Sequence, residues 1–326
     1  MSKNEILDEI RSGIINKINL INEEYDNIVV TSGIVTIEEL FEEFTHEYED
    51  GYVLTDIFSA IQGVTIGGEG STEIYTNVKD NVEIEGLLVY KSIMGRNIDA
   101  YQINWTNEYI IFPYLIEDDK FVPAFYNKEI GNDVLNFDIN LDPKEIGTER
   151  TQKLMHRVAK GYVDYIDVAE YLIQHYDDLY YRSFEGKSML EYGKYWYEYH
   201  RSRSPEIISK PKIVARRLMR IPSFAIDYVG YLPRDSVICF TPKKEFSTLL
   251  NELEEILEEK ISIIQGLEYV LSYLNSDWFF EVLDRKRAKK KGDYPRLGER
   301  MLKSVVIPSP SSIETEELRK RIARAC

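Results

Sequence analysis

The chain has 326 residues, of which 44% are apolar, 12% aromatic and 29% charged. This composition excludes a disordered or collagen-like polypeptide and predicts one or two packed domains. No run of eighteen apolar residues occurs and the first residues are polar and acidic, so we expect neither a membrane span nor a secretion signal. The two cysteines, Cys239 and Cys326, are too few for a disulfide framework, and a cytoplasmic setting is expected.

The formal net charge of -16 is distributed unevenly along the chain. Residues 1–150 carry 30 acidic and 10 basic side chains, whereas residues 151–326 carry 26 acidic and 30 basic ones. Basic side chains are concentrated in two stretches: residues 201–220 have seven basic side chains against one acidic, and residues 285–303 have nine against two. Because phosphate binding draws on clustered lysine and arginine, only the second half suits a polyanion.

The first half is expected to contain two helices followed by strands. Apolar residues three or four apart predict a helix from Leu7 to about Glu24, and a short acidic helix is expected over 37–48. From 52 to 125, β-branched and aromatic runs broken by turn residues are typical of several strands. Residues 127–150 are polar and are expected to form a long loop. Alternating oxygen-bearing residues from Asp138 onward resemble a calcium loop, but Pro143 stands where glycine is needed, which leaves calcium a minor alternative.

The second half is expected to mix helices and strands. Helical spacing returns over 150–182, and strands are predicted at 212–218 and 236–240. Apolar residues recur every seven positions over 246–283, which predicts one long helix that Gly266 bends or breaks. Additional isoleucines widen its apolar stripe, so packing onto the chain's own core is favoured over a seam between two chains.

The predicted elements together indicate an α+β fold in which a β-rich body is braced by long helices. The expected organisation, in chain order, is an acidic helical lead over 1–50, a first β-rich part over 51–126, a linker and helical segment over 127–165, a second part over 166–310 with the long helix 246–283, and a C-terminal tail over 311–326.

The sequence contains no recognisable catalytic motif. It lacks the Pro-Pro pair found at the target base of DNA-methylating enzymes, and Glu69 stands in the glycine-rich segment where it would repel a phosphate. The four histidines are far apart in sequence, with none in a metal-binding pair, and Cys239 lies within an apolar strand. We therefore expect that the chain is not an enzyme by itself.

Within about 55–120 and 165–308, nine short segments follow one another in an order and spacing that point to one protein family more specifically than any single motif does. They are Gly63–Gly67, Gly95–Ile98, Ile110–Tyr114, Tyr195–Glu198, Lys210–Val214, Phe224–Asp227, Leu274–Ser276, Tyr294–Arg296 and Ile307–Pro308. In this arrangement the chain resembles the TaqI-like target-recognition domain at the C-terminal end of many DNA-adenine methyltransferases and fused restriction-modification enzymes. The first fifty residues are not covered, the family's catalytic domain is missing, and residues 246–265 look like an inserted docking or spacer element.

The resemblance implies that the chain recognises a short sequence in double-stranded DNA and presents it to a methyltransferase or restriction partner. S-adenosylmethionine and magnesium are then expected on that partner or on a missing catalytic part, with no cofactor on this chain. Two alternatives stay open. In the first alternative, the chain is a fragment of a bifunctional type II restriction enzyme and adenine-specific methyltransferase. In the second, the chain is an interaction protein whose acidic half imitates DNA.

The expected DNA-binding residues combine the charge pattern with the resemblance. Lysines of the second basic stretch suit phosphates, arginines of the first offer paired donors to guanine, and polar residues of two turns suit base edges. They are Thr65, Glu69, Ser71, Arg96, Asn97, Lys210, Lys212, Arg216, Arg217, Arg220, Lys289, Lys290, Lys291, Tyr294 and Arg296. The cations are expected to gather on one concave face of duplex width.

These assignments have structural alternatives. The three consecutive lysines also fit a solvated basic loop, and the arginines fit ion pairs with the acidic helices. The aromatic segment Tyr195–Tyr199 resembles a stacking platform for bases, but large aromatic residues beside strands are more often core residues. Trp196 is therefore assigned to the core.

Overall fold

The computed structural model describes residues 51–68, 70–76, 88–127, 132, 133, 135, 165–285, 290, 291, 294–303 and 305–323. The chain divides into two units, Met1–Gly51 and Tyr52–Cys326, and the features below belong to the second apart from Gly51 at the start of the first described strand. The helices predicted within 1–50 and the calcium-like loop at 138–149 lie outside the described residues.

The largest described sheet has four antiparallel strands in the order β14–β13–β16–β2. Their bounds are β2 (Phe58–Gln62), β13 (Lys212–Arg216), β14 (Phe224–Asp227) and β16 (Val237–Pro242). Strands β13 and β16 confirm the two strands predicted in the second half. Ile61 of β2 pairs with Cys239 of β16, so the two β-rich parts of the sequence share one sheet.

A second sheet has three strands, in the order β15–β3–β6. Strand β3 (Val89–Ile93) pairs in parallel with β15 (Leu232–Pro233) and antiparallel with β6 (Tyr109–Ile111). Ten other strands form five short antiparallel pairs. These are β4 (Ile98–Asp99) with β5 (Gln102–Ile103), β7 (Tyr114–Glu117) with β8 (Lys120–Pro123), β9 (Tyr126–Asn127) with β10 (Asn132–Asp133), β11 (Ser183–Phe184) with β12 (Lys187–Ser188), and β17 (Lys290–Lys291) with β18 (Tyr294–Pro295). The β9–β10 pair lies in the segment expected to be a loop.

Three helices, rather than one, occupy residues 246–285, so the prediction of one long helix is wrong. They are α9 (Phe246–Leu257), α10 (Ile263–Leu274) and α11 (Asp277–Arg285). Helix α9 ends at Glu258, which has a left-handed backbone with φ of 56°. Helix α10 begins with a reciprocal cap in which Ser262 and Gln265 each bond the other's backbone N–H. The helix is therefore interrupted between Leu257 and Ile263.

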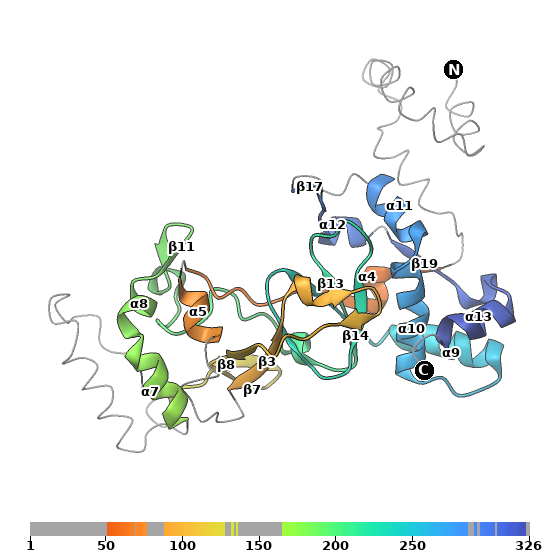
Figure 1. Ribbon diagram of the computed structural model, residues 1–326. Helices are drawn as coiled ribbons and strands as arrows, with labels where there is room; N and C mark the ends of the chain where they lie inside the picture. Colours follow the sequence, from red (N-terminus) through yellow and green to blue (C-terminus); the bar gives the residue numbers. More distant parts are fainter. Residues whose placement is uncertain are drawn as a thin grey trace, which may run out of the picture. The chain divides into compact units, whose positions relative to one another are not determined.

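Gly266 is not the point of the break, because it lies inside α10. A Cβ at this position would lie 2.3 Å from Leu250 Cδ2 and 3.1 Å from Phe246 Cζ, so glycine allows α9 to pack closely against α10. Helix α13 (Thr315–Ile322) joins this pair, and Figure 1 shows the three helices side by side. Arg319 of α13 donates to the carbonyl oxygen of Leu257 at 3.2 Å.

These helices cover the four-stranded sheet and form one apolar core with it. Side chains shared by the core include Ile213, Phe224 and Phe240 from the sheet and Phe246, Leu253, Leu267, Leu274 and Phe279 from the helices. Helix α10 is buried along the whole of Gly266–Leu274, where most side chains are apolar or aromatic and Glu268 and Ser272 are buried polar side chains. Packing onto the chain's own core is thus confirmed, and α9 is an integral part of that core.

A second core forms around β6, α7 (Ile166–Gln174) and α8 (Tyr176–Tyr180). Trp196 is buried there, as predicted, and its indole N–H donates to the carbonyl oxygen of Leu135 at 2.9 Å. Tyr197 and Tyr199 are fully buried as well. They therefore belong to the core and present no ring to a base.

The remaining described elements are short. They are β1 (Gly51–Val53), α4 (Leu54–Ile57), α5 (Ser71–Thr76), α12 (Glu299–Leu302), β19 (Val306–Pro308) and the 3-10 turns η2 (Gly95–Asn97), η4 (Leu190–Tyr192), η5 (Pro205–Ile208) and η6 (Pro310–Ser312). Helices and mainly antiparallel strands thus confirm the α+β class.

Candidate nucleic-acid interface

The two basic stretches of the sequence meet directly after β13. Leu218 and Arg296 form an isolated antiparallel bridge, and the Leu297 backbone N–H donates to the carbonyl oxygen of Arg217 at 2.9 Å. Arg296 is exposed and Arg217 is half-buried. Folding therefore joins two cationic segments that are nearly eighty residues apart in sequence.

The hairpin of β17 and β18 leads into this junction. Lys290 pairs with Pro295 and Lys291 pairs with Tyr294 along its two strands. Only the backbone of these four residues is described, and Lys289 lies outside the described residues. The hairpin places Lys290 and Lys291 on the chain segment that enters the junction at Arg296. That all these cations share one concave face stays a prediction.

Arg216, the last residue of β13, is already engaged within the protein. Its guanidinium forms an ion pair with Asp99 and donates to the carbonyl oxygen of Ile98, both in β4. The expected competitor for this arginine was a carboxylate of the acidic helices, whereas the structure supplies one from a hairpin. Arg220, four residues further, is exposed.

Lys212 is fully buried, which corrects its assignment as a DNA-binding residue. Its ammonium forms an ion pair with Asp227 and donates to the carbonyl oxygen of Ser209 at 2.9 Å. Asp227 also accepts backbone N–H bonds from Val229, Gly230 and Tyr231, each at 2.9 Å. A phosphate cannot reach an ammonium with no exposed surface, so Lys212 is structural. Lys210, two residues earlier, is exposed.

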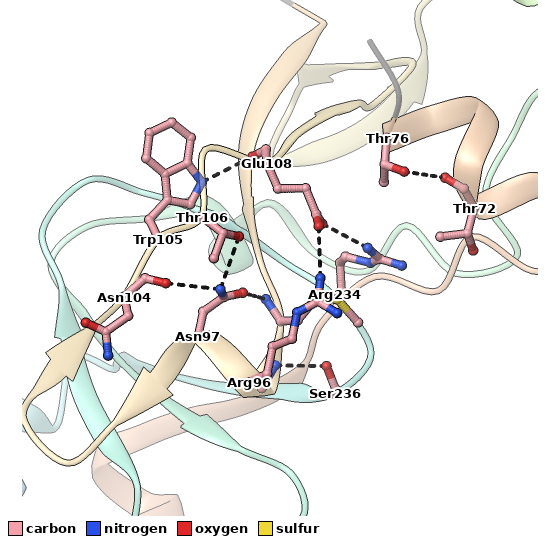
Figure 2. A network of polar contacts seen from close by, with 12 residues as sticks. Thr72, Thr76, Arg96, Asn97, Asn104, Trp105, Thr106, Glu108, Arg234 and Ser236 are labelled. Atoms are coloured by element: carbon pink, nitrogen blue, oxygen red, sulfur yellow. Dashed lines mark hydrogen bonds and ion pairs between the residues drawn. The ribbon is translucent and has the colours of Figure 1, made fainter. Parts of the chain in front are cut away.

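Arg96 and Asn97 lie together in η2 but differ in their surroundings (Figure 2). The side-chain oxygen of buried Asn97 accepts from the Met94 backbone at 2.8 Å, and its amide donates to the carbonyl oxygen of Asn104 at 3.0 Å. Asn97 thus holds the turn and has little surface for a base. Arg96 is exposed and forms an ion pair with Glu108 at 3.3 Å.

The glycines of the glycine-rich turn allow other segments of the same chain to pack closely against it. A Cβ on Gly63 would lie 2.2 Å from the Arg234 carbonyl oxygen, and one on Gly67 would lie 2.7 Å from His200 Cβ. Ser71 is buried, and its hydroxyl donates to the carbonyl oxygens of Gly67 and Gly68 at 2.6 and 2.9 Å. Thr65 is half-buried, whereas Glu69 lies outside the described residues.

Three further arginines cluster around Gly63–Thr65, and the sequence did not single them out. Thr65 and Arg201 exchange two backbone hydrogen bonds of 3.0 Å, and Arg203 Nε donates to the Gly63 carbonyl oxygen at 3.2 Å. Arg234 is bridged to Val64 and pairs with Glu108 at 2.9 Å. Desolvation and neighbouring Arg201 lower the pKa of Arg203. For Arg201 and Arg203 the sequence signal was the high basic count of 201–220, which does not show what those residues approach, and Arg234 lies outside that stretch.

The turn Arg234–Ser236 contacts both groups of cations. Arg217 N–H donates to the Ser236 carbonyl oxygen at 2.9 Å, and Gly95 N–H donates to the Ser236 hydroxyl at 2.9 Å. Arg234 at the other end of this turn shares Glu108 with Arg96, as Figure 2 shows. One turn therefore links the β13–β14 connection to the cluster around Gly63–Thr65.

Cys239 is expected to be unreactive in the folded protein. It is fully buried in β16, and desolvation raises the pKa of its thiol to about 12. In a Cys326→Ser chain, we expect negligible labelling by a thiol reagent at pH 8 and full labelling after denaturation in urea. Labelling of the same variant in urea is the positive control. Rapid labelling of the folded variant would contradict the burial of this strand.

Two further properties concern the part of the chain that the structure describes. Within it, no group of three or more His, Cys, Asp or Glu side chains has the arrangement of a metal site. No described helix has the length and hydropathy to cross a membrane.

No protein-family description and no curated protein matches the sequence. Among solved structures, the chain is similar to part of BpuSI, a type IIG restriction endonuclease, with 14% identity and a TM-score of 0.44. The alignment covers 93% of this chain and 30% of that chain, so the protein corresponds to less than a third of that enzyme's length.

Proposed function

We propose that the chain is the DNA target-recognition part of a restriction-modification system. It binds a short duplex sequence and presents it to a methyltransferase or nuclease partner. The observation that carries the proposal is the junction of Arg217 and Leu218 with Arg296 and Leu297, which joins both basic stretches. The resemblance to TaqI-like domains includes Tyr294–Arg296 within this junction and supports the same assignment.

Some of the proposed residues contact the phosphates of the duplex, and others contact its bases. Lys289, Lys290 and Lys291 contact phosphates, which sets the position of the duplex without reading its sequence. Arg217 and Arg296 lie at the junction, and Arg220 follows Arg217 by three residues; these arginines are proposed to offer planar, paired donors to guanine. Arg216 instead holds the β4–β5 hairpin through Asp99. Lys212, Asn97 and Ser71 are likewise proposed to stabilise the fold and not to contact bases.

The acidic first half is proposed to face solvent or a basic surface of the partner. Residues 1–150 carry a threefold excess of acidic side chains and would repel a duplex laid along them. Base flipping and methylation of an adenine, or strand cleavage, are assigned to the partner together with S-adenosylmethionine and magnesium. The chain on its own then binds DNA without changing it.

The salt dependence of duplex binding tests the phosphate contacts. Each phosphate neutralised by lysine or arginine contributes about 0.9 to the slope of log affinity against log salt concentration. We therefore expect the triple variant Lys289→Ala, Lys290→Ala, Lys291→Ala to reduce the slope by about 3. Fluorescence anisotropy with a labelled duplex at several salt concentrations measures it.

A matched triple variant separates local contacts from total charge. Lys120, Lys187 and Lys320 are exposed and lie outside both basic stretches, so replacing them by alanine should leave the slope unchanged. Equal slopes for both triple variants would remove the hairpin lysines from the interface. Selection from a randomised duplex pool then tests recognition, since a target-recognition domain enriches one short sequence. A DNA mimic would enrich none and would displace duplex from a nuclease.

A further inference from the structure

The carboxylate of Glu108 is shared by two arginines from different segments of the chain (Figure 2). Its Oε1 atom lies 2.9 Å from Nη1 of Arg234, and its Oε2 atom lies 3.3 Å from Nη2 of Arg96. The two guanidinium groups differ in exposure, because 13% of the Arg234 side chain is exposed against 67% of the Arg96 side chain. Glu108 therefore joins an exposed arginine to a sheltered ion pair.

The sheltered pair is fixed to strand β3. The carbonyl oxygen of Glu108 accepts from the Ser92 N–H at 2.9 Å, and the Arg234 N–H donates to the carbonyl oxygen of Ile93 at 3.0 Å. Both partners of the 2.9 Å ion pair are thus held by their own backbones. Arg96 reaches the same carboxylate from the exposed side, so the position of its guanidinium is set by Glu108.

The turn η2, which carries Arg96, contacts the same residue as the junction of the two basic stretches. The Ser236 hydroxyl accepts from the Gly95 N–H, and the Ser236 carbonyl oxygen accepts from the Arg217 N–H, at 2.9 Å in each case. A Cβ on Gly95 would lie 2.8 Å from that carbonyl oxygen, so η2 packs directly on Ser236. Arg96 thus follows a residue that is in contact with the turn bonded to the junction.

The described charges around η2 leave a positive excess. One carboxylate, that of Glu108, serves two guanidinium groups. The acidic side chains that are near η2 or its partner turn in sequence face other cations, because Asp99 pairs with Arg216 and Asp235 interacts with Arg203. The exposed guanidinium of η2 is therefore positioned by a carboxylate that does not fully neutralise it.

We propose that Arg96 reads a guanine of the bound duplex and that Glu108 is its positioning residue. Guanine is read by two N–H groups held in one orientation, whereas a phosphate contact tolerates a mobile side chain. The guanidinium has five N–H groups, and the pair with Glu108 engages Nη2, so other N–H groups stay available for a base edge. The proposal rests on the proposed function, because it assumes that duplex DNA lies at the junction. It adds a residue pair that determines base preference at one position.

Selection from a randomised duplex pool by the full-length chain and its variants tests this pair. We expect Arg96→Gln to lower the preference for guanine at one position about tenfold or more, with the salt slope of binding unchanged. Glu108→Gln should weaken the preference at the same position, because it removes the charge that holds the guanidinium. In a chain that already carries Arg96→Gln, adding Glu108→Gln should change nothing further. Glu108→Asp keeps a charge for Arg234 but shortens the reach to Arg96, so it serves as the second variant if Glu108→Gln is unfolded in urea denaturation.

The control is Glu259→Gln, which breaks an exposed ion pair of similar length, 3.2 Å, with Arg319. It should leave every base preference unchanged. If Arg96→Gln lowers affinity for all sequences alike and reduces the salt slope by about 0.9, Arg96 contacts a phosphate and base reading is refuted. If the Glu108 variants keep the parent's preference, or lower it equally without Arg96, the positioning role is refuted. In both cases recognition stands, whereas a parent chain that enriches no sequence fails the recognition role itself.

Discussion

Replacing Lys212 by alanine is expected to lower the free energy of unfolding by about 3 to 5 kcal/mol. The ammonium and the Asp227 carboxylate are both fully buried, so the variant leaves a carboxylate without its cation inside the sheet. The three backbone N–H groups that donate to Asp227 stay in place but carry no full charge. The midpoint and slope of urea denaturation, followed by tryptophan fluorescence, measure the loss.

The control is Lys320→Ala, which breaks an exposed ion pair with Glu316 of 3.0 Å on α13. Exposed pairs of this kind contribute at most about 0.5 kcal/mol, so this variant should unfold at nearly the parent's urea concentration. The comparison also tests the corrected role of Lys212. If Lys212→Ala kept the parent's stability but lost affinity for duplex DNA, the ammonium would belong to the interface after all.

Replacing Gly63 by alanine is expected to lower the free energy of unfolding by about 3 kcal/mol, near the upper end for an overpacked core. The added Cβ would lie 2.2 Å from the carbonyl oxygen of Arg234 and 2.4 Å from that of Pro233. Both obstacles are backbone atoms, so no side-chain rotation relieves them. Gly63 N–H donates to the Val237 carbonyl oxygen at 3.0 Å, and Val64 N–H donates to that of Pro233 at 2.8 Å. Separation of the two segments would break both bonds.

Gly298→Ala is the matched control for Gly63→Ala. No atom lies within 4 Å of a Cβ built on Gly298, so this variant should change the free energy of unfolding by no more than about 0.5 kcal/mol. Both variants are compared by urea denaturation under the same conditions. Equal stability of the two would show that β15 and the segment after β2 can separate without cost.

The sequence was informative about local elements and less so about where they end. Apolar periodicity over 246–283 showed helix and a wide buried face, and both are present. The single helix was wrong because a seven-residue repeat continues across a break between two helices when both helices pack on the same core. The cap formed by Ser262 and Gln265 was a readable signal for the start of α10.

The sequence predicted the positive charge of the candidate site, but not which acidic side chains pair with its cations. Both basic stretches were visible in the sequence, and the β13 and β16 strands were placed correctly. Lys212 and Arg216 looked equivalent to other cations of their stretch, yet one is buried with Asp227 and the other is paired with Asp99. Their carboxylates are 15 and 117 residues away, and composition cannot show which acidic side chain a cation meets.

The amino-acid sequence by itself determined the α+β class, the location of several strands, the buried role of Trp196 and the concentration of cations in the second half. These follow from side-chain polarity and periodicity, which act over a few residues. Only the tertiary structure decided that the backbone segments of Arg217 and Arg296 are neighbours and that Lys212 is inaccessible. Those outcomes depend on contacts between distant segments, because burial and pairing are set by the whole packed chain.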